Sequence, residues 1–140
     1  MGFSSFDTRQ VAELLFERYG GFGRGFDRQV FRVAPGESAM RRFGGTGRFG
    51  TGANMAFRRE FFAQGGLFDP ALDVGTPTNG GGDLEMFFRV LKNGHALVYE
   101  PAAIVRHRHR RSYEDLRTQI TNNGIGFFVN SVTPPSSLVN

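Results

Sequence analysis

The sequence predicts an α/β domain, because patterns typical of amphipathic helices alternate along the chain with patterns typical of short strands. The main helical signal is an apolar stripe at positions i, i+3, i+4 and i+7, made by Leu84, Phe87, Phe88 and Leu91. The main strand signals are the alternating runs at residues 29–33 and 95–100. A chain of 140 residues, of which 39% are hydrophobic, is long enough to form one domain with a packed core.

The composition narrows the class of protein. The chain contains no cysteine, which excludes disulfides, thiolate metal sites and a cysteine nucleophile. No run approaches the ~18 consecutive apolar residues of a transmembrane helix, and the N-terminus lacks the basic-then-apolar layout of a signal peptide. We therefore expect no transmembrane segment in this chain and a cytoplasmic location.

The charge pattern allows polyanionic partners. The net charge is +4, and all of the 17 basic residues except Lys92 are arginines. The planar guanidinium fork holds phosphate or carboxylate groups in a bidentate manner, so a nucleotide, a nucleic acid or a lipid headgroup is a candidate ligand. A genome rich in arginine codons explains the same composition, and the charge alone does not decide between the two.

The N-terminal part predicts one helix and one strand. Residues 7–10 have the spacing of a capping box, and an apolar face follows until Gly20 and Gly21 end the helix. Residues 29–33 form the first strand, and Pro35 with Gly36 forms a turn after it.

The middle of the chain predicts a strand, a helix and a long loop. Residues 51–57 suit a buried strand that begins with small side chains. Residues 58–64 continue as a short helix, which two glycines stop. Residues 67–82 are rich in proline and glycine and have no period, which indicates a loop. Long loops inside compact domains are usually functional.

That loop ends at an acidic residue. Gly80, Gly81 and Gly82 precede Asp83, which is placed at the N-cap or in the first turn of the central helix, and Gly94 closes this helix. Because the glycines carry no side chain, a ligand can approach the backbone where the carboxylate emerges. Asp83 is thus either a plain helix cap or a functional acid.

The C-terminal part predicts two strands and a helix. Residues 95–100 form a strand that Pro101 ends, and residues 103–110 form another, with His107 and His109 on one face. The two imidazoles are either a metal pair or surface histidines of a basic strand. Ser112 caps a further helix, which we expect to end at residues 122–124, before a short apolar stretch.

Two segments rich in glycine, arginine and phenylalanine, residues 20–28 and 41–52, support a different class of function. Arginine on phosphates with phenylalanine stacked on bases is typical of single-strand nucleic-acid binding. The other interpretation is a pair of mobile loops beside an active site. Neither segment matches a phosphate-binding loop, since the lysine of GxxxxGK[ST] and the spacing of GxGxxG are both missing.

Four motifs, taken together and in order, resemble the C-terminal half of bacterial family 2 glycosyltransferases. They are TGANMAFRRE at 51–60, GGLFDPALD at 65–73, GGGDLEMFFRVLKNGHALVYEP at 80–101 and AAIVRHRHRRSYEDL at 102–116. Residues 12–26 also look like the region just upstream. The resemblance implies a partial GT-A fold, a Rossmann-like mixed sheet with flanking helices whose N-terminal, nucleotide-binding half is missing. Residues 1–130 would be the acceptor-side portion and residues 131–140 a flexible tail.

The resemblance also implies roles for particular residues. Asp83 matches the catalytic base, although the glutamate that often precedes this base is Gly82 here. His107 matches a histidine beside the metal and diphosphate in some members. The expected substrate-binding residues are Asn54, Gly81, Gly82, Glu85, Arg110 and Arg111.

The reaction that the resemblance implies is sugar transfer with inversion, from a nucleotide-sugar donor to a saccharide or lipid-linked acceptor, as in polysaccharide or cell-envelope biosynthesis. A divalent cation, Mn²⁺ or Mg²⁺, is expected in the complete enzyme, but the family's metal-binding Asp-x-Asp is absent from this chain. We therefore expect a fragment with little or no activity alone, completed by the missing N-terminal half or by a second copy, and located in the cytoplasm or peripherally at the inner face of the membrane.

Two alternatives remain open at the level of sequence. The first is an RNA- or DNA-binding module that uses the Gly/Arg/Phe segments. The second is a non-catalytic remnant that only pairs with another subunit.

Overall fold

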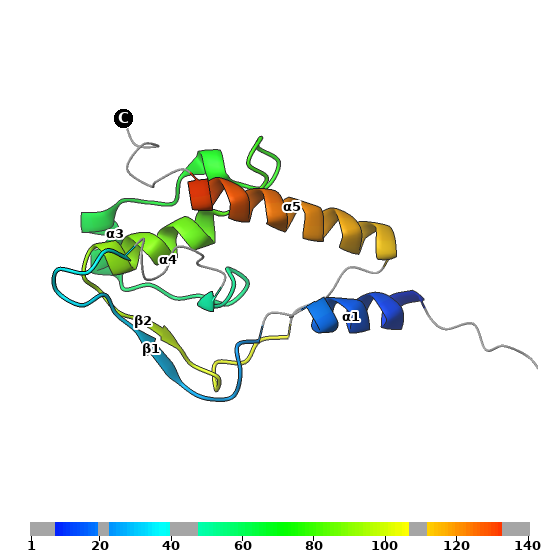
Figure 1. Cartoon of the computed structure of the whole chain (residues 1–140), viewed down its shortest axis with the longest axis horizontal. Coiled ribbons are helices and arrows are strands. Elements are labelled where there is room, and N and C mark those ends of the chain that lie inside the picture. The colour runs from blue at the N-terminus through cyan, green and yellow to red at the C-terminus, as the bar shows by residue number, and fades with distance from the viewer. Residues whose placement is uncertain (1–7, 20–22, 40–47, 107–111, 133–140) are drawn as a thin grey trace, which may run out of the picture.

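The computed structural model describes residues 8–19, 23–39, 48–106 and 112–132, and the predictions for His107, Arg110 and Arg111 lie outside these ranges. In chain order the elements are α1 (Thr8–Tyr19), β1 (Gln29–Phe31), α3 (Arg59–Gly65), the 3-10 helix η2 (Pro70–Leu72), α4 (Gly82–Lys92), β2 (Leu97–Tyr99) and α5 (Tyr113–Val132). Figure 1 shows α4 between α5 and the β1–β2 ribbon, with α1 beside the start of α5. The helix and strand patterns at α1, β1, α3, α4 and β2 are confirmed, with strands shorter than predicted.

The two strands form an antiparallel ribbon. Val30 lies opposite Val98, and both side chains are exposed, whereas Phe31 and its partner Leu97 turn toward the core. This alternation is the period-two pattern that predicted the strands. Among the described residues these are the only strands, so the mixed sheet is not observed there and the partial GT-A fold stays a prediction.

The prediction of a strand at residues 51–57 is wrong, because backbone amides of this segment donate to partners outside any sheet. The Gly52 N–H donates to the side chain of Asp83, and the Asn54 N–H donates to the carbonyl of Thr51 in a turn. These donors are therefore lost to a sheet ladder. Residues 103–106 are also outside any strand: the amides of Ala103 and Ile104 close turns on Glu100 and Ala102.

Helix α4 is the centre of the core. Its apolar stripe was predicted from spacing, and its buried hydrophobic side chains are Met86, Phe87, Phe88, Val90 and Leu91. One side packs with Phe49 and the inner face of the ribbon, and another packs with Phe61 of α3. Burying a side chain of this size contributes roughly 1.5–3 kcal/mol, so α4 is held mainly by its tertiary contacts.

Phe57 fixes the irregular segment 51–57 against this core. Its ring lies 5.7–6.2 Å, centroid to centroid, from four other rings, those of Phe61, Phe62, Phe68 and Phe87. Aromatic pairs at this separation stabilise by about 0.5–1.5 kcal/mol beyond burial. The segment is therefore anchored next to α4 although it forms no strand.

Helix α5 continues beyond its predicted end. Ser112 precedes it and accepts the Asp115 N–H at 3.1 Å, which confirms the predicted cap. The helix then runs through Gly124 and Gly126 to Val132, so the end predicted at residues 122–124 is wrong. Its first half packs Leu116 against Phe16 of α1. Its last two residues lie in the segment predicted as a tail, the rest of which is outside the described ranges.

None of the helices in the described part of the chain combines the length and the apolar character needed to cross a bilayer.

Candidate functional site

Asp83 lies in the first turn of α4, directly after a glycine-only approach. The helix is capped by Gly81, whose φ of 108° is in the left-handed region, and Gly80 before it has a φ of 125°. Residues with a side chain rarely adopt these angles, so the glycines are required by the backbone. Because Gly81 occupies the cap position, Asp83 is not the plain N-cap that one interpretation of the sequence proposed.

The carboxylate of Asp83 is half-buried and held by backbone amides. Its Oδ2 accepts the Gly52 N–H at 2.8 Å, and its Oδ1 accepts the Leu84 N–H at 2.9 Å. Two N–H donors and the start of a helix stabilise a negative charge at this position. A carboxylate has about four acceptor positions, so each oxygen keeps a lone pair beyond these two bonds.

Gly52 is a site residue that the sequence did not single out. A side chain at this position would begin 3.0 Å from both Cβ and Oδ2 of Asp83, which is tighter than nine in ten real Cβ contacts, so the carboxylate would have to shift by a few tenths of an ångström. Only glycine therefore lets the loop donate its amide at 2.8 Å without displacing the carboxylate. The available signal was the small side chains at the start of 51–57, which were interpreted as the beginning of a strand.

Gly82 has a different environment from Gly52. A Cβ on Gly82 would lie 3.6 Å from the carbonyl oxygen of Leu72 and 3.9 Å from the ring of Phe68, which are ordinary contact distances. Gly82 thus packs against the loop before α4. The carbonyl of Gly81 accepts the Glu85 N–H at 3.0 Å, which is the first hydrogen bond of the helix.

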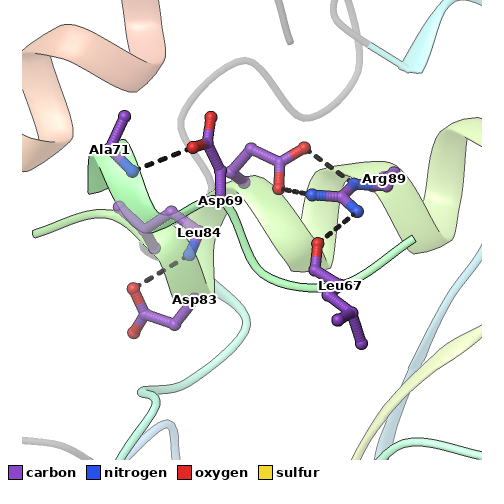
Figure 2. A network of polar contacts seen from close by, with 7 residues as sticks. Leu67, Asp69, Ala71, Asp83, Leu84 and Arg89 are labelled. Atoms are coloured by element: carbon purple, nitrogen blue, oxygen red, sulfur yellow. Dashed lines mark hydrogen bonds and ion pairs between the residues drawn. The ribbon is translucent and has the colours of Figure 1, made fainter. Parts of the chain in front are cut away.

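Glu85 pairs with Arg89 one turn along α4. Its Oε1 accepts from Nε of Arg89 at 2.9 Å, its second oxygen accepts from Nη2, and Nη1 donates to the carbonyl of Leu67 at 2.9 Å. Figure 2 shows this network, with the Asp83 carboxylate lying apart from it. The Glu85 residue is only 5% exposed, so its geometry favours a positioning role over the substrate contact that was predicted.

Asn54 lies in the same loop as Gly52. Its Nδ2 donates to the carbonyl of Ala103 at 2.6 Å, which links the loop to the segment leading toward residues 107–111. The structure thus brings Asp83, Gly81, Gly82 and Glu85 together at the start of α4 and adds Gly52.

The described residues do not fit a divalent cation. They contain no group of three or more histidine, aspartate or glutamate side chains close enough to hold one. The two groups that hold Asp83 are backbone N–H donors, which cannot ligate a cation. We therefore derive no step through a metal ion.

Comparison of the chain with protein-family models, with curated proteins and with solved structures finds no match. The resemblance to family 2 glycosyltransferases consequently rests on the sequence motifs alone.

Proposed function

We propose that this chain is the acceptor side of a glycosyltransferase and that Asp83 is its general base. The observation that carries the proposal is the Asp83 carboxylate, which is half-exposed, fixed through both oxygens and approached through a backbone of glycines. A base must be within hydrogen-bond reach of the proton that it removes. Fixed, half-exposed oxygens with spare lone pairs meet that requirement for a hydroxyl group.

In the proposed reaction an acceptor hydroxyl lies against Asp83 while its oxygen attacks C1 of the donor sugar. The new bond from oxygen to C1 forms as the bond from C1 to the diphosphate oxygen breaks, and the hydroxyl proton passes to Asp83. Attack from the side opposite the leaving group inverts C1. General-base catalysis of this kind contributes roughly 10²–10⁴-fold, and positioning supplies a further share.

Donor binding is assigned to another part of the complete enzyme. The sequence contains no Asp-x-Asp, and the described residues hold no metal-binding cluster. The proposal therefore predicts acceptor binding by this chain without a donor, and little or no turnover by the chain alone.

The test is a nuclear magnetic resonance titration of the purified chain. The probes are methyl glycosides of glucose, galactose, mannose and N-acetylglucosamine, with octyl glucoside as a lipid-linked analogue. We expect at least one of them to shift the amide signals of Gly52 and Leu84, which bond to Asp83. The response should be lost in Asp83→Ala. It should persist in Asp69→Ala, whose carboxylate instead accepts the Ala71 N–H at the start of η2 (Figure 2). No response to any probe at millimolar concentration would contradict the proposal.

A second candidate, nucleic-acid binding, is favoured by one observation. Tyr99 accepts the Arg24 N–H at 3.1 Å and donates to the carbonyl of Gly25 at 2.9 Å, which fixes the segment that carries Phe26. Phe26 is 98% exposed, and an exposed ring next to arginines suits stacking on a base.

The two candidates predict different outcomes in one binding experiment. Nucleic-acid binding predicts salt-dependent affinity for a labelled oligonucleotide that falls in Phe26→Ala and is unchanged in Asp83→Ala. The glycosyltransferase proposal predicts the opposite sensitivity in the saccharide titration. A non-catalytic remnant would show neither response.

A further inference from the structure

The geometry points to Gly126 of α5 as a positioning residue for Asp83. The contact on which this inference depends lies between α5 and the glycine turn before α4. That the positioned carboxylate acts as a base rests on the proposed function, but the contact and its test do not.

The contact is made by backbone atoms on both sides. A Cβ on Gly126 would lie 2.9 Å from the carbonyl oxygen of Gly80, 3.0 Å from its carbonyl carbon and 3.2 Å from the nitrogen of Gly81. Gly126 is buried. Backbone atoms cannot rotate away as the end of a flexible side chain can, so any side chain at residue 126 has to move either α5 or the turn.

The turn transmits such a movement directly to Asp83. Gly80 and Gly81 have φ angles of 125° and 108°, and Gly81 is the cap of α4. Asp83 follows two residues later and accepts the amide of Gly52 on another segment, where an added Cβ would lie only 3.0 Å from the carboxylate. Asp83 is therefore bonded to Gly52 in the loop, and the turn just before it packs against Gly126 of α5.

The other glycine of α5, Gly124, shows that this role is specific to Gly126. A glycine in a helix interior is less favourable than alanine by roughly 0.5–1 kcal/mol. Gly124 has no atom within 4 Å of its Cβ position, so nothing in its described surroundings requires glycine. At residue 126, two positions further along the same helix, glycine is required because the backbone of Gly80 lies so close. Gly124→Ala is consequently a matched control for Gly126→Ala.

The test follows the Gly52 amide by hydrogen exchange, because this amide donates to Asp83. We expect at least tenfold faster exchange in Gly126→Ala and a shifted amide signal, with neither change in Gly124→Ala. A loss of α5 stability alone would speed exchange through unfolding but leave the Gly52 amide signal of the folded chain in place, so the shifted signal is the readout specific to positioning. Equal exchange in the two variants, whether both match the wild type or both are raised, would overturn the inference.

A measurement on the wild-type chain keeps the inference testable if Gly126→Ala does not fold. In native-state hydrogen exchange under low denaturant, the Gly52 and Gly126 amides should open in the same step with the same denaturant dependence. If Gly52 stays protected after Gly126 has opened, α5 does not position Asp83. Because neither readout involves a saccharide, the inference can fail while the acceptor titration succeeds, or hold while the titration fails.

Discussion

The Gly52 N–H donates to Oδ2 of Asp83 at 2.8 Å, and a Cβ on the same glycine would lie only 3.0 Å from that oxygen. The two residues are 31 positions apart in the sequence, so the loop and the start of α4 are aligned through this bond. Phe57 holds the other end of the loop in the core. The candidate base is thus oriented by a backbone amide that packing keeps in place.

Gly52→Ala should destabilise the chain and move Asp83. The added Cβ begins 3.0 Å from Oδ2, and overpacking of this kind costs about 1–3 kcal/mol. Denaturant unfolding gives the free-energy change, and the Leu84 amide signal reports the displaced carboxylate. Gly23→Ala is the control, because no atom lies within 4 Å of its Cβ position, and it should change stability by less than about 0.5 kcal/mol. Equal effects would show that the close approach at Gly52 is not maintained in solution.

Arg89→Leu should be strongly destabilising, because it leaves Glu85 buried without its partner. Loss of one member of a buried pair costs about 3–5 kcal/mol. Arg28→Leu breaks the pair of Arg28 with Glu100, whose side chains are 60% and 44% exposed, and should cost no more than about 1 kcal/mol. Urea denaturation of both variants measures the difference. If Arg89→Leu lowers the free energy of unfolding by as little as Arg28→Leu does, then Glu85 reaches solvent or another partner.

Tyr99→Phe should release the segment at Arg24 and Gly25. The change removes one hydroxyl that makes two hydrogen bonds, each contributing about 1 kcal/mol. Faster hydrogen exchange of the Arg24 amide is the direct measurement, with global stability measured alongside. Tyr113→Phe serves as the control, because Tyr113 is exposed at the start of α5. Unchanged Arg24 exchange would contradict the assignment.

Met86→Ala should cost about 2–5 kcal/mol, because this side chain of α4 is fully buried against Phe61 of α3 and its removal leaves a cavity. Met55→Ala, at an exposed position before Phe57, should cost less than about 0.5 kcal/mol. Thermal or urea unfolding distinguishes them. Similar values for the two variants would place the core elsewhere.

The sequence by itself determined the elements whose signals are local. The apolar stripe of α4 and the alternation at Val30 and Val98 need only neighbours along the chain, and both patterns appear in the structure at the predicted places. Local spacing also placed Asp83 at the N-cap or in the first turn of α4, and the structure has it in the first turn. The proposed reaction, in contrast, rests on motifs that the comparisons leave without a match.

Only the tertiary structure decided the conformation of two segments in which the local sequence pattern was misleading. Small residues at 51–57 resembled a strand, but the amide of Gly52 bonds to a side chain on α4 and cannot join a ladder. Residues 122–124 resembled a helix end, yet α5 continues, and Gly126 beyond them packs on Gly80. Both outcomes depend on partners far away in the sequence, and local propensities of about 1 kcal/mol yield to such contacts.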